Sequence, residues 1–313
     1  MHGLHNLRHL RRFFVLAALI GMLMLTACSG ADGRTIGQAP SHGTELTPSQ
    51  QADADEMDNP AQDAGEHAQD PEQPTTEAGQ DEHEGTPPEE PNPQEDEHMD
   101  READALEAIR TRYDITDPAS IAVLVNKTYG LPEDYEPDDL VKVDIPFVYQ
   151  DDSVHSLRQV AADALVEMFA AAKEDGIELA GVSGYRSYAI QKMLYEKYAA
   201  RDGQEAADKY SARPGHSEHM TGLAMDVAEL SGRCAARNCF ADTEEAKWLA
   251  EHAHEFGFII RYPLGKEEIT GYQYEPWHLR YVGVELAQIL YENDWTMEEF
   301  FLPESVNAVN MNG

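Results

Sequence analysis

Two stretches of the sequence decide its interpretation: PGHSEHMTGLAMDV at residues 214–227 and EPWHLRY at residues 275–281. They contain imidazole side chains, an aspartate flanked by small residues, and a glutamate. Two imidazoles and one carboxylate form a ligand set of catalytic zinc sites, which leave one coordination position for water and have a base nearby. The sequence therefore predicts a metal centre whose ligands are His219, Asp226 and His278.

Both stretches show the alternation of a β-strand around these ligands. In LAMDVA (residues 223–228), large apolar residues take the odd positions, and Ala, Asp and Ala take the even ones. In WHLRY (residues 277–281), Trp, Leu and Tyr alternate with His and Arg. Because successive side chains of a strand point to opposite faces, two such strands can bring Asp226 and His278 to a common point. His219 would arrive from the glycine-bounded turn before the first strand.

Two charged residues near the predicted metal site are candidates for catalysis. Glu275 precedes Pro276, and a residue before proline favours an extended conformation, which fixes where this predicted base enters the site. Arg186 follows the apolar segment Ile177–Val182, which we expect to form a strand. A guanidinium at the end of a strand can pair with the carbonyl or carboxylate oxygens of a substrate. The alternative is an ordinary surface arginine on a turn.

The pattern S-x-H-x-x-G-x-x-x-D at residues 217–226, followed by E-x-x-H at residues 275–278, resembles the signature of a known enzyme family. That family is the VanY-type D-alanyl-D-alanine carboxypeptidases, zinc peptidases of the LAS group (lysostaphin, D-Ala-D-Ala peptidases and hedgehog). The resemblance extends to SGYRSYAIQ at residues 183–191 and covers roughly residues 120–295.

This resemblance implies a zinc metallocarboxypeptidase of cell-wall metabolism. Its activity would be that of a D,D-carboxypeptidase, which removes the C-terminal D-alanine from peptidoglycan stem peptides. The resemblance also implies one Zn²⁺ per chain, Glu275 as the catalytic base and stabilisation of the oxyanion by Arg186. The residues expected to contact the substrate are Ser187, Gln191, Ser217 and Tyr185. A packing role is an equally good interpretation of Tyr185.

Three other functions are compatible with this sequence. An L,D-carboxypeptidase that trims tetrapeptide stems to tripeptides needs the same metal, base and arginine. A peptidoglycan endopeptidase that cuts cross-bridges needs a cleft that is open at both ends. A non-catalytic, wall-binding zinc lipoprotein needs neither Glu275 nor Arg186, so the presence of both residues argues against it.

The first 27 residues are predicted to be a lipoprotein signal peptide. Three arginines precede the apolar run Phe13–Leu25, which is too short for a comfortable membrane span. The run ends in LTAC at residues 25–28, which resembles a bacterial lipobox and implies cleavage before a lipidated Cys28. The expected location is the extracytoplasmic face of the bacterial membrane, with reach into the wall. An ordinary secretory signal and an uncleaved anchor are the alternatives, and both also export the chain.

Residues 28–100 have the composition of a disordered acidic linker. From residue 29 onward they contain twenty Asp and Glu, one arginine and no aromatic residue. Such a segment cannot bury enough apolar surface to offset the entropy of ordering, and charge repulsion would extend it into a spacer. Residues 101–313 are long enough for one domain with a sizeable core, which we expect to be the carboxypeptidase domain. Their acidic balance argues against a nucleic-acid partner.

Local patterns predict an α+β domain, and the resemblance implies a small, mainly antiparallel central sheet flanked by helices. We expect helices over Ala103–Tyr113, Ser156–Lys173, Tyr188–Ala200, Thr243–Phe256, Val284–Asn293 and Met297–Phe300, and further strands over Phe258–Arg261 and Ile269–Tyr274. With Cys28 assigned to lipid, the two remaining cysteines of an exported chain are expected to form a disulfide, Cys234–Cys239. Its loop follows the metal strand and is expected at the rim of the cleft.

Overall fold

The computed structural model describes residues 93–303 and residue 306. The predicted signal peptide (1–27), the predicted lipidation at Cys28 and the predicted linker as far as residue 92 lie outside the described residues. Among the described residues, no helix is both long enough and apolar enough to cross a membrane.

Helix α2 (Pro93–Arg110) begins earlier than the expected helix at residue 103 and before the expected domain boundary at residue 101. Its first residue is a proline, which is favourable at this position because the missing N–H would have had no partner inside the helix. At the other end, Leu106 and Ile109 pack against the apolar cluster around the C-terminal helices.

The central sheet has four antiparallel strands in the order β3 (Leu179–Ser183), β4 (Ala224–Glu229), β6 (Glu275–Tyr281) and β5 (Phe258–Tyr262). A second, two-stranded antiparallel sheet pairs β1 (Leu140–Lys142) with β2 (Ser156–Arg158). This architecture confirms the predicted α+β class with a small antiparallel sheet. The register of the central sheet places Asp226 opposite His278 on one side and opposite Ser183 on the other.

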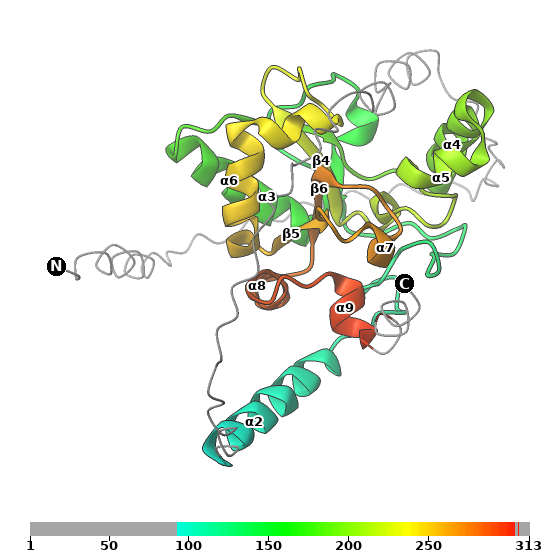
Figure 1. The fold of residues 1–313 in the computed structure, drawn as a ribbon. Coiled ribbons are helices and arrows are strands. Elements are labelled where there is room, and N and C mark those ends of the chain that lie inside the picture. The colour runs from blue at the N-terminus through cyan, green and yellow to red at the C-terminus, as the bar shows by residue number, and fades with distance from the viewer. Residues whose placement is uncertain (1–92, 304–305, 307–313) are drawn as a thin grey trace, which may run out of the picture. The chain divides into compact units, whose positions relative to one another are not determined.

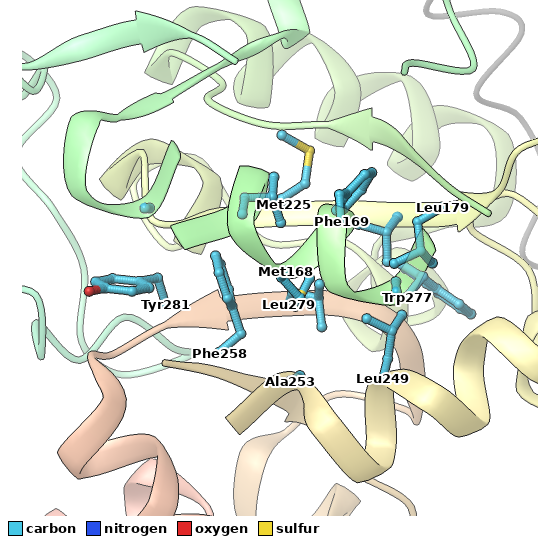
Figure 2. Close-up of a cluster of buried hydrophobic side chains, with 14 of the residues drawn as sticks. Met168, Phe169, Leu179, Met225, Leu249, Ala253, Phe258, Trp277, Leu279 and Tyr281 are labelled. Carbon is cyan, nitrogen blue, oxygen red and sulfur yellow. The ribbon is translucent and has the colours of Figure 1, made fainter. Parts of the chain in front are cut away.

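One face of the central sheet carries the main core (Figure 2). Trp277, Leu279 and Tyr281 point to this face because they alternate along β6. They pack against side chains of α3 (Gln159–Glu174) and α6 (Glu244–His252), and Figure 1 shows both helices on one side of the strands. Leu279 is completely buried. Burial of such a side chain contributes about 1.5–3 kcal/mol to folding.

The opposite side of the sheet is flanked by α4 (Tyr188–Asp202) and α5 (Gln204–Tyr210) (Figure 1). The chain then makes a short 3-10 turn, η2 (Glu218–Thr221), which ends at Gly222 in the left-handed region at φ 67°. A side chain at this glycine would also meet Arg158 Cγ at 2.9 Å. Gly222 therefore allows the sharp turn that leads directly from the histidine motif into β4.

The C-terminal part of the described chain contains α7 (Glu267–Thr270) before β6, and α8 (Val284–Glu292) and α9 (Met297–Phe301) after it. Helix α9 begins with a capping box, in which Thr296 and Glu299 satisfy each other's backbone N–H groups. Leu286, Met297 and Phe300 are buried together in a second apolar cluster, which covers the outer edge of the central sheet through Ile259.

Other expected elements also differ from the structure. The helix expected over Thr243–Phe256 continues as a 3-10 helix from Ala253. The predicted strand Ile269–Tyr274 is wrong: α7 ends at Thr270, and Gly271, at φ 77°, turns the chain toward β6. The predicted helix Ser156–Lys173 begins only at Gln159, because residues 156–158 pair with β1.

Candidate active site

The structure brings His219, Asp226 and His278 together from three separate elements. His219 lies on the η2 turn, Asp226 on β4 and His278 on β6. Each offers one ligand atom, and these three atoms all lie within 4.8 Å of one another. All three side chains are buried, with 2%, 7% and 4% of their surface exposed. Local alternation and strand register therefore produce the convergence that the sequence predicted.

Hydrogen bonds orient both imidazoles toward Asp226. His219 Nδ1 donates to the carbonyl oxygen of Gly184 at 2.8 Å, which leaves Nε2 at 3.3 Å from Asp226 Oδ2. His278 Nε2 lies 3.3 Å from Glu218 Oε2, which leaves Nδ1 at 3.0 Å from Asp226 Oδ1. That buried oxygen makes no well-aligned hydrogen bond to any described residue. Two inward ring nitrogens and an unsatisfied carboxylate oxygen are a donor set that fits Zn²⁺.

The two histidines differ in acidity. Burial, together with the charge of Arg186, lowers the pKa of His219 to about 4. Burial also acts to lower the pKa of His278, but the neighbouring carboxylates of Asp226 and Glu218 outweigh it and raise that pKa to about 9. The pKa of Asp226 is lowered well below its usual range because the two imidazoles outweigh the effect of burial.

Glu275 and Arg186 stand beside this cluster. Glu275 begins β6, and its Oε2 lies 3.9 Å from His278 Nδ1. Burial raises the pKa of Glu275 to about 8, against the opposing charges of His278 and Arg186. Arg186 Nε is buried without a hydrogen-bond partner in the described part of the chain, and its backbone N–H donates to the carbonyl oxygen of His219 at 3.2 Å. A proton acceptor and an uncommitted guanidinium thus line one cleft with the metal-ligand set.

Comparison with known proteins agrees with this chemistry. Residues 154–284 match the VanY family, described as D-alanyl-D-alanine carboxypeptidase. YodJ of Bacillus subtilis, whose name gives carboxypeptidase as a provisional activity, is 46% identical over 202 residues, which span 64% of this chain and 72% of YodJ. The chain belongs to the VanY family.

Two further relatives are named for specific activities. VanXYC of Enterococcus gallinarum, a bifunctional D-Ala-D-Ala dipeptidase and D-Ala-D-Ala carboxypeptidase, is 37% identical over 56% of this chain and 91% of its own length. The solved structure of the LD-carboxypeptidase LdcB, which is described as revealing the basis of peptidoglycan recognition, is 49% identical, with a TM-score of 0.57. It covers 59% of this chain and 86% of that chain. The proteins similar to this chain thus include one named for D-Ala-D-Ala carboxypeptidase activity and one named as an LD-carboxypeptidase.

The residues predicted to bind substrate fall into two groups. Gln191 and Ser217 line the cleft, and Gln191 is held by a bond from its Nε2 to the carbonyl oxygen of Ala212 at 2.7 Å. Gln191 Oε1 is buried and has no hydrogen-bond partner among the described residues. Ser187 and Tyr185 do not line this cleft. Ser187 instead caps α4, where its side chain accepts from the Ile190 N–H.

The rim of the cleft includes the loop after β4. A disulfide joins Cys234 and Cys239, and between them Ala236 lines the cleft, as expected for a loop that follows the metal strand. Ala236 has φ 50°, a conformation that non-glycine residues rarely adopt. The disulfide-closed loop therefore contributes Ala236 to the rim of the cleft.

Sequence reasoning passed over several polar residues of this VanY-family site. Ser183 lines the cleft and lies opposite Asp226, and its buried hydroxyl has no partner in residues 93–303. Glu218, Arg261 and Arg280 form a buried ionic cluster directly behind His278. The sequence offered two signals of this cluster: Glu218 is adjacent to the predicted ligand His219, and Arg280 follows the predicted ligand His278 by two positions. The pairing itself could not be seen, because the two arginines lie 43 and 62 residues from Glu218.

A second hollow, an apolar groove of about 340 Å³ beside α8, is larger than the cleft of about 110 Å³ at the metal-ligand set. Leu249, Phe258 and Leu290 line this groove. It lacks the combination of carboxylate, imidazole and guanidinium that hydrolysis needs. The chemistry of the lining residues, rather than the volume of the hollow, therefore identifies the candidate active site.

Proposed function

We propose that this protein is a zinc-dependent D,D-carboxypeptidase that removes the C-terminal D-alanine from peptidoglycan stem peptides. The observation that carries the proposal is the convergence of His219 Nε2, His278 Nδ1 and the Asp226 carboxylate beside Glu275 and Arg186. The names of the relatives support the substrate class, because VanXYC is named for D-Ala-D-Ala and LdcB for peptidoglycan recognition.

His219, Asp226 and His278 would hold the zinc ion through one atom each. When bound, zinc supplies a Lewis acid that polarises the scissile carbonyl and lowers the pKa of water toward neutrality. The three ligands come from a turn and two hydrogen-bonded strands, so their spacing is set by the backbone of the sheet.

Glu275 serves as the general base and then as the general acid. It accepts a proton from the attacking water and passes it to the leaving amine of D-alanine. Burial raises the pKa of this carboxyl to about 8 in the metal-free protein, and a bound zinc ion would lower it toward neutrality, where a carboxyl group can both accept and return a proton. Arg186 pairs with the negative charge that develops on the carbonyl oxygen, because its buried Nε has no other described partner to satisfy.

The second candidate is an L,D-carboxypeptidase that trims tetrapeptide stems to tripeptides. The likeness to LdcB favours it, since that LD-carboxypeptidase is 49% identical and covers 59% of this chain. Both candidates use the same ligands, base and arginine. They differ in the configuration of the residue that precedes the scissile bond.

The deciding experiment offers the purified, zinc-loaded full chain two substrates, pentapeptide and tetrapeptide stems, and identifies the products by mass spectrometry. Tetrapeptide formed from pentapeptide supports the D,D-carboxypeptidase. Tripeptide formed from tetrapeptide alone supports the L,D-enzyme and overturns the D,D assignment. A chelator should stop either reaction, and added zinc should restore it. Cleavage of neither stem by the zinc-bound chain would contradict both candidates and leave endopeptidase or binding functions.

Zinc binding at pH 7 is expected to release between about one and two protons per ion, because ligands must lose protons to bind a metal. His278 has a pKa of about 9 in the metal-free protein and so carries a proton on Nδ1 that zinc must displace. Glu275, with a pKa of about 8, adds to the release as the zinc charge lowers that pKa. Zinc affinity should therefore rise with pH up to about 9.

Calorimetric titration in buffers of different ionisation enthalpy measures this release. The control is His252→Gln, which changes a histidine on α6 outside the ligand cluster and should leave the release unchanged. Equal binding enthalpies in all buffers would contradict the prediction.

We further propose that the chain is exported and anchored as a lipoprotein, a proposal supported by the apolar leader and the LTAC motif at residues 25–28. Cys28→Ala is expected to abolish incorporation of labelled fatty acid and to move the protein out of the bacterial membrane fraction. Ser29→Ala is the neighbouring control and should keep the label. Full lipid labelling of the Cys28→Ala variant would refute this assignment.

A further inference from the structure

Glu218 occupies an unusual position, between two residues of the cleft but with its side chain turned into a fully buried ionic cluster. Its exposed side-chain fraction is 0%, as are those of its partners Arg261 and Arg280. Glu218 Oε1 accepts from Arg261 Nε at 2.8 Å and from Arg280 Nη1 at 2.7 Å. Its other oxygen, Oε2, faces His278 Nε2 at 3.3 Å.

The two arginines are themselves fixed by further contacts. Arg261 donates from Nη1 and Nη2 to both oxygens of Glu298 on α9, at 2.9 and 2.6 Å. Arg280 Nη2 donates to the carbonyl oxygens of Ile121 and Val123 at 3.0 and 2.8 Å. Two buried carboxylates thus face two buried guanidinium groups, and their charges balance. The cluster holds the Glu218 carboxylate in one orientation.

This orientation determines which nitrogen of His278 faces the predicted metal position. An ionised carboxylate can only accept a hydrogen bond, so His278 Nε2 must carry a proton to bond with Glu218. Nδ1 is then the nitrogen that can bind a metal, and it lies on the side of Asp226. His219 has the opposite arrangement, since its Nδ1 bonds to the Gly184 carbonyl and its Nε2 faces Asp226.

We propose that Glu218 is a positioning residue of the metal site, which fixes the ring orientation and tautomer of His278 while Arg261 and Arg280 hold the Glu218 carboxylate in place. The inference rests on the zinc site proposed above. Glu298 provides the internal contrast: it belongs to the same buried cluster, yet its hydrogen bonds go to Arg261 and Asn126 and it contacts no predicted ligand.

The test compares Glu218→Gln with Glu298→Gln in the full chain. Both changes remove one negative charge from the same cluster, so both should lower stability. In the Glu218→Gln variant, the amide oxygen must stay toward the two arginines, and the amide NH₂ then faces His278 Nε2. That donor opposes the Nε2–H tautomer and favours a proton on Nδ1, where the metal should bind.

We expect Glu218→Gln to weaken zinc affinity by about 10–100-fold, as measured by competition with a chromophoric chelator, and Glu298→Gln to leave it unchanged. Equal zinc affinity in the two variants would overturn the inference. If the wild-type chain itself does not bind zinc, the proposed function fails instead, so the two failures are distinguishable.

A measurement on the wild-type chain covers the case in which Glu218→Gln does not fold. NMR of the protein, loaded with an NMR-active cadmium isotope and carrying labelled histidine nitrogens, reports which ring nitrogen binds the metal. The expected coupling is to Nδ1 of His278 and to Nε2 of His219. Coupling of cadmium to Nε2 of His278 would refute the assigned role of Glu218.

Discussion

Glu275→Gln is expected to lower kcat by about 10²–10⁴-fold, the range that general acid–base catalysis contributes. The amide has nearly the same shape as the carboxyl group but cannot take a proton from water or return one to the leaving amine. Glu275 is not one of the three clustered ligands, so the variant should still bind one zinc ion per chain, with only the weaker affinity that follows from the loss of a nearby negative charge. The measurement pairs stem-peptide hydrolysis with zinc titration on the same preparation.

The matched control is Glu167→Gln, which makes the same chemical change on the exposed side of α3 and should retain full activity. A Glu275→Gln variant with near wild-type kcat would show that another group handles the proton. Loss of zinc together with activity would instead mean that Glu275 acts as a ligand.

Arg261→Met is expected to lower the free energy of unfolding by about 3–5 kcal/mol, the cost of removing one partner from a buried ion pair. The change leaves Glu298 without its charged partner and Glu218 with one of its two. Methionine fills part of the volume, so the loss comes mainly from uncompensated charge. Urea denaturation of the chain in excess chelator measures the effect without a contribution from metal binding.

Lys142→Met is the surface control. Lys142 and Asp152 form an ion pair whose side chains are 59% and 72% exposed, and such pairs contribute about 0–1 kcal/mol. Adding Glu298→Gln to Arg261→Met should recover part of the stability, because it restores the charge balance of the cluster. If the Arg261→Met variant is as stable as the Lys142→Met variant, the buried ion pairs of Arg261 do not contribute to the free energy of unfolding as predicted.

The sequence was most informative where alternation and chemistry coincided. In β4 and β6, the period of two separated the core residues from the polar ones, and it placed Asp226 and His278 on a shared face before any pairing was known. The strand expected at 269–274 failed because Tyr272 and Tyr274 show the same period of two, whereas the preceding residues form α7. Gly271 ends that helix with a positive φ, and the periodicity of apolar residues in the sequence does not reveal such a backbone conformation.

Contacts between distant segments were the part that local patterns could not supply. Glu218 looked like one more acid in an acidic chain, and only the fold shows that Arg261 and Arg280 flank it. Ser187 illustrates the reverse case. Its motif suggested substrate contact, but its position before α4 gives its hydroxyl a capping role, which serine performs at many helix starts.

The disulfide-closed loop after β4 makes one part of the cleft independent of the strand pairing that positions the metal-ligand set. The metal-ligand set depends on the pairing of β4 with β6, where a shift of one residue would turn the side chain of His278 away from Asp226 and toward the core. The loop between Cys234 and Cys239 also borders the cleft through Ala236, but it lies outside that pairing. Substitutions within this loop therefore change the rim of the cleft without disturbing the strand pairing that brings Asp226 and His278 together.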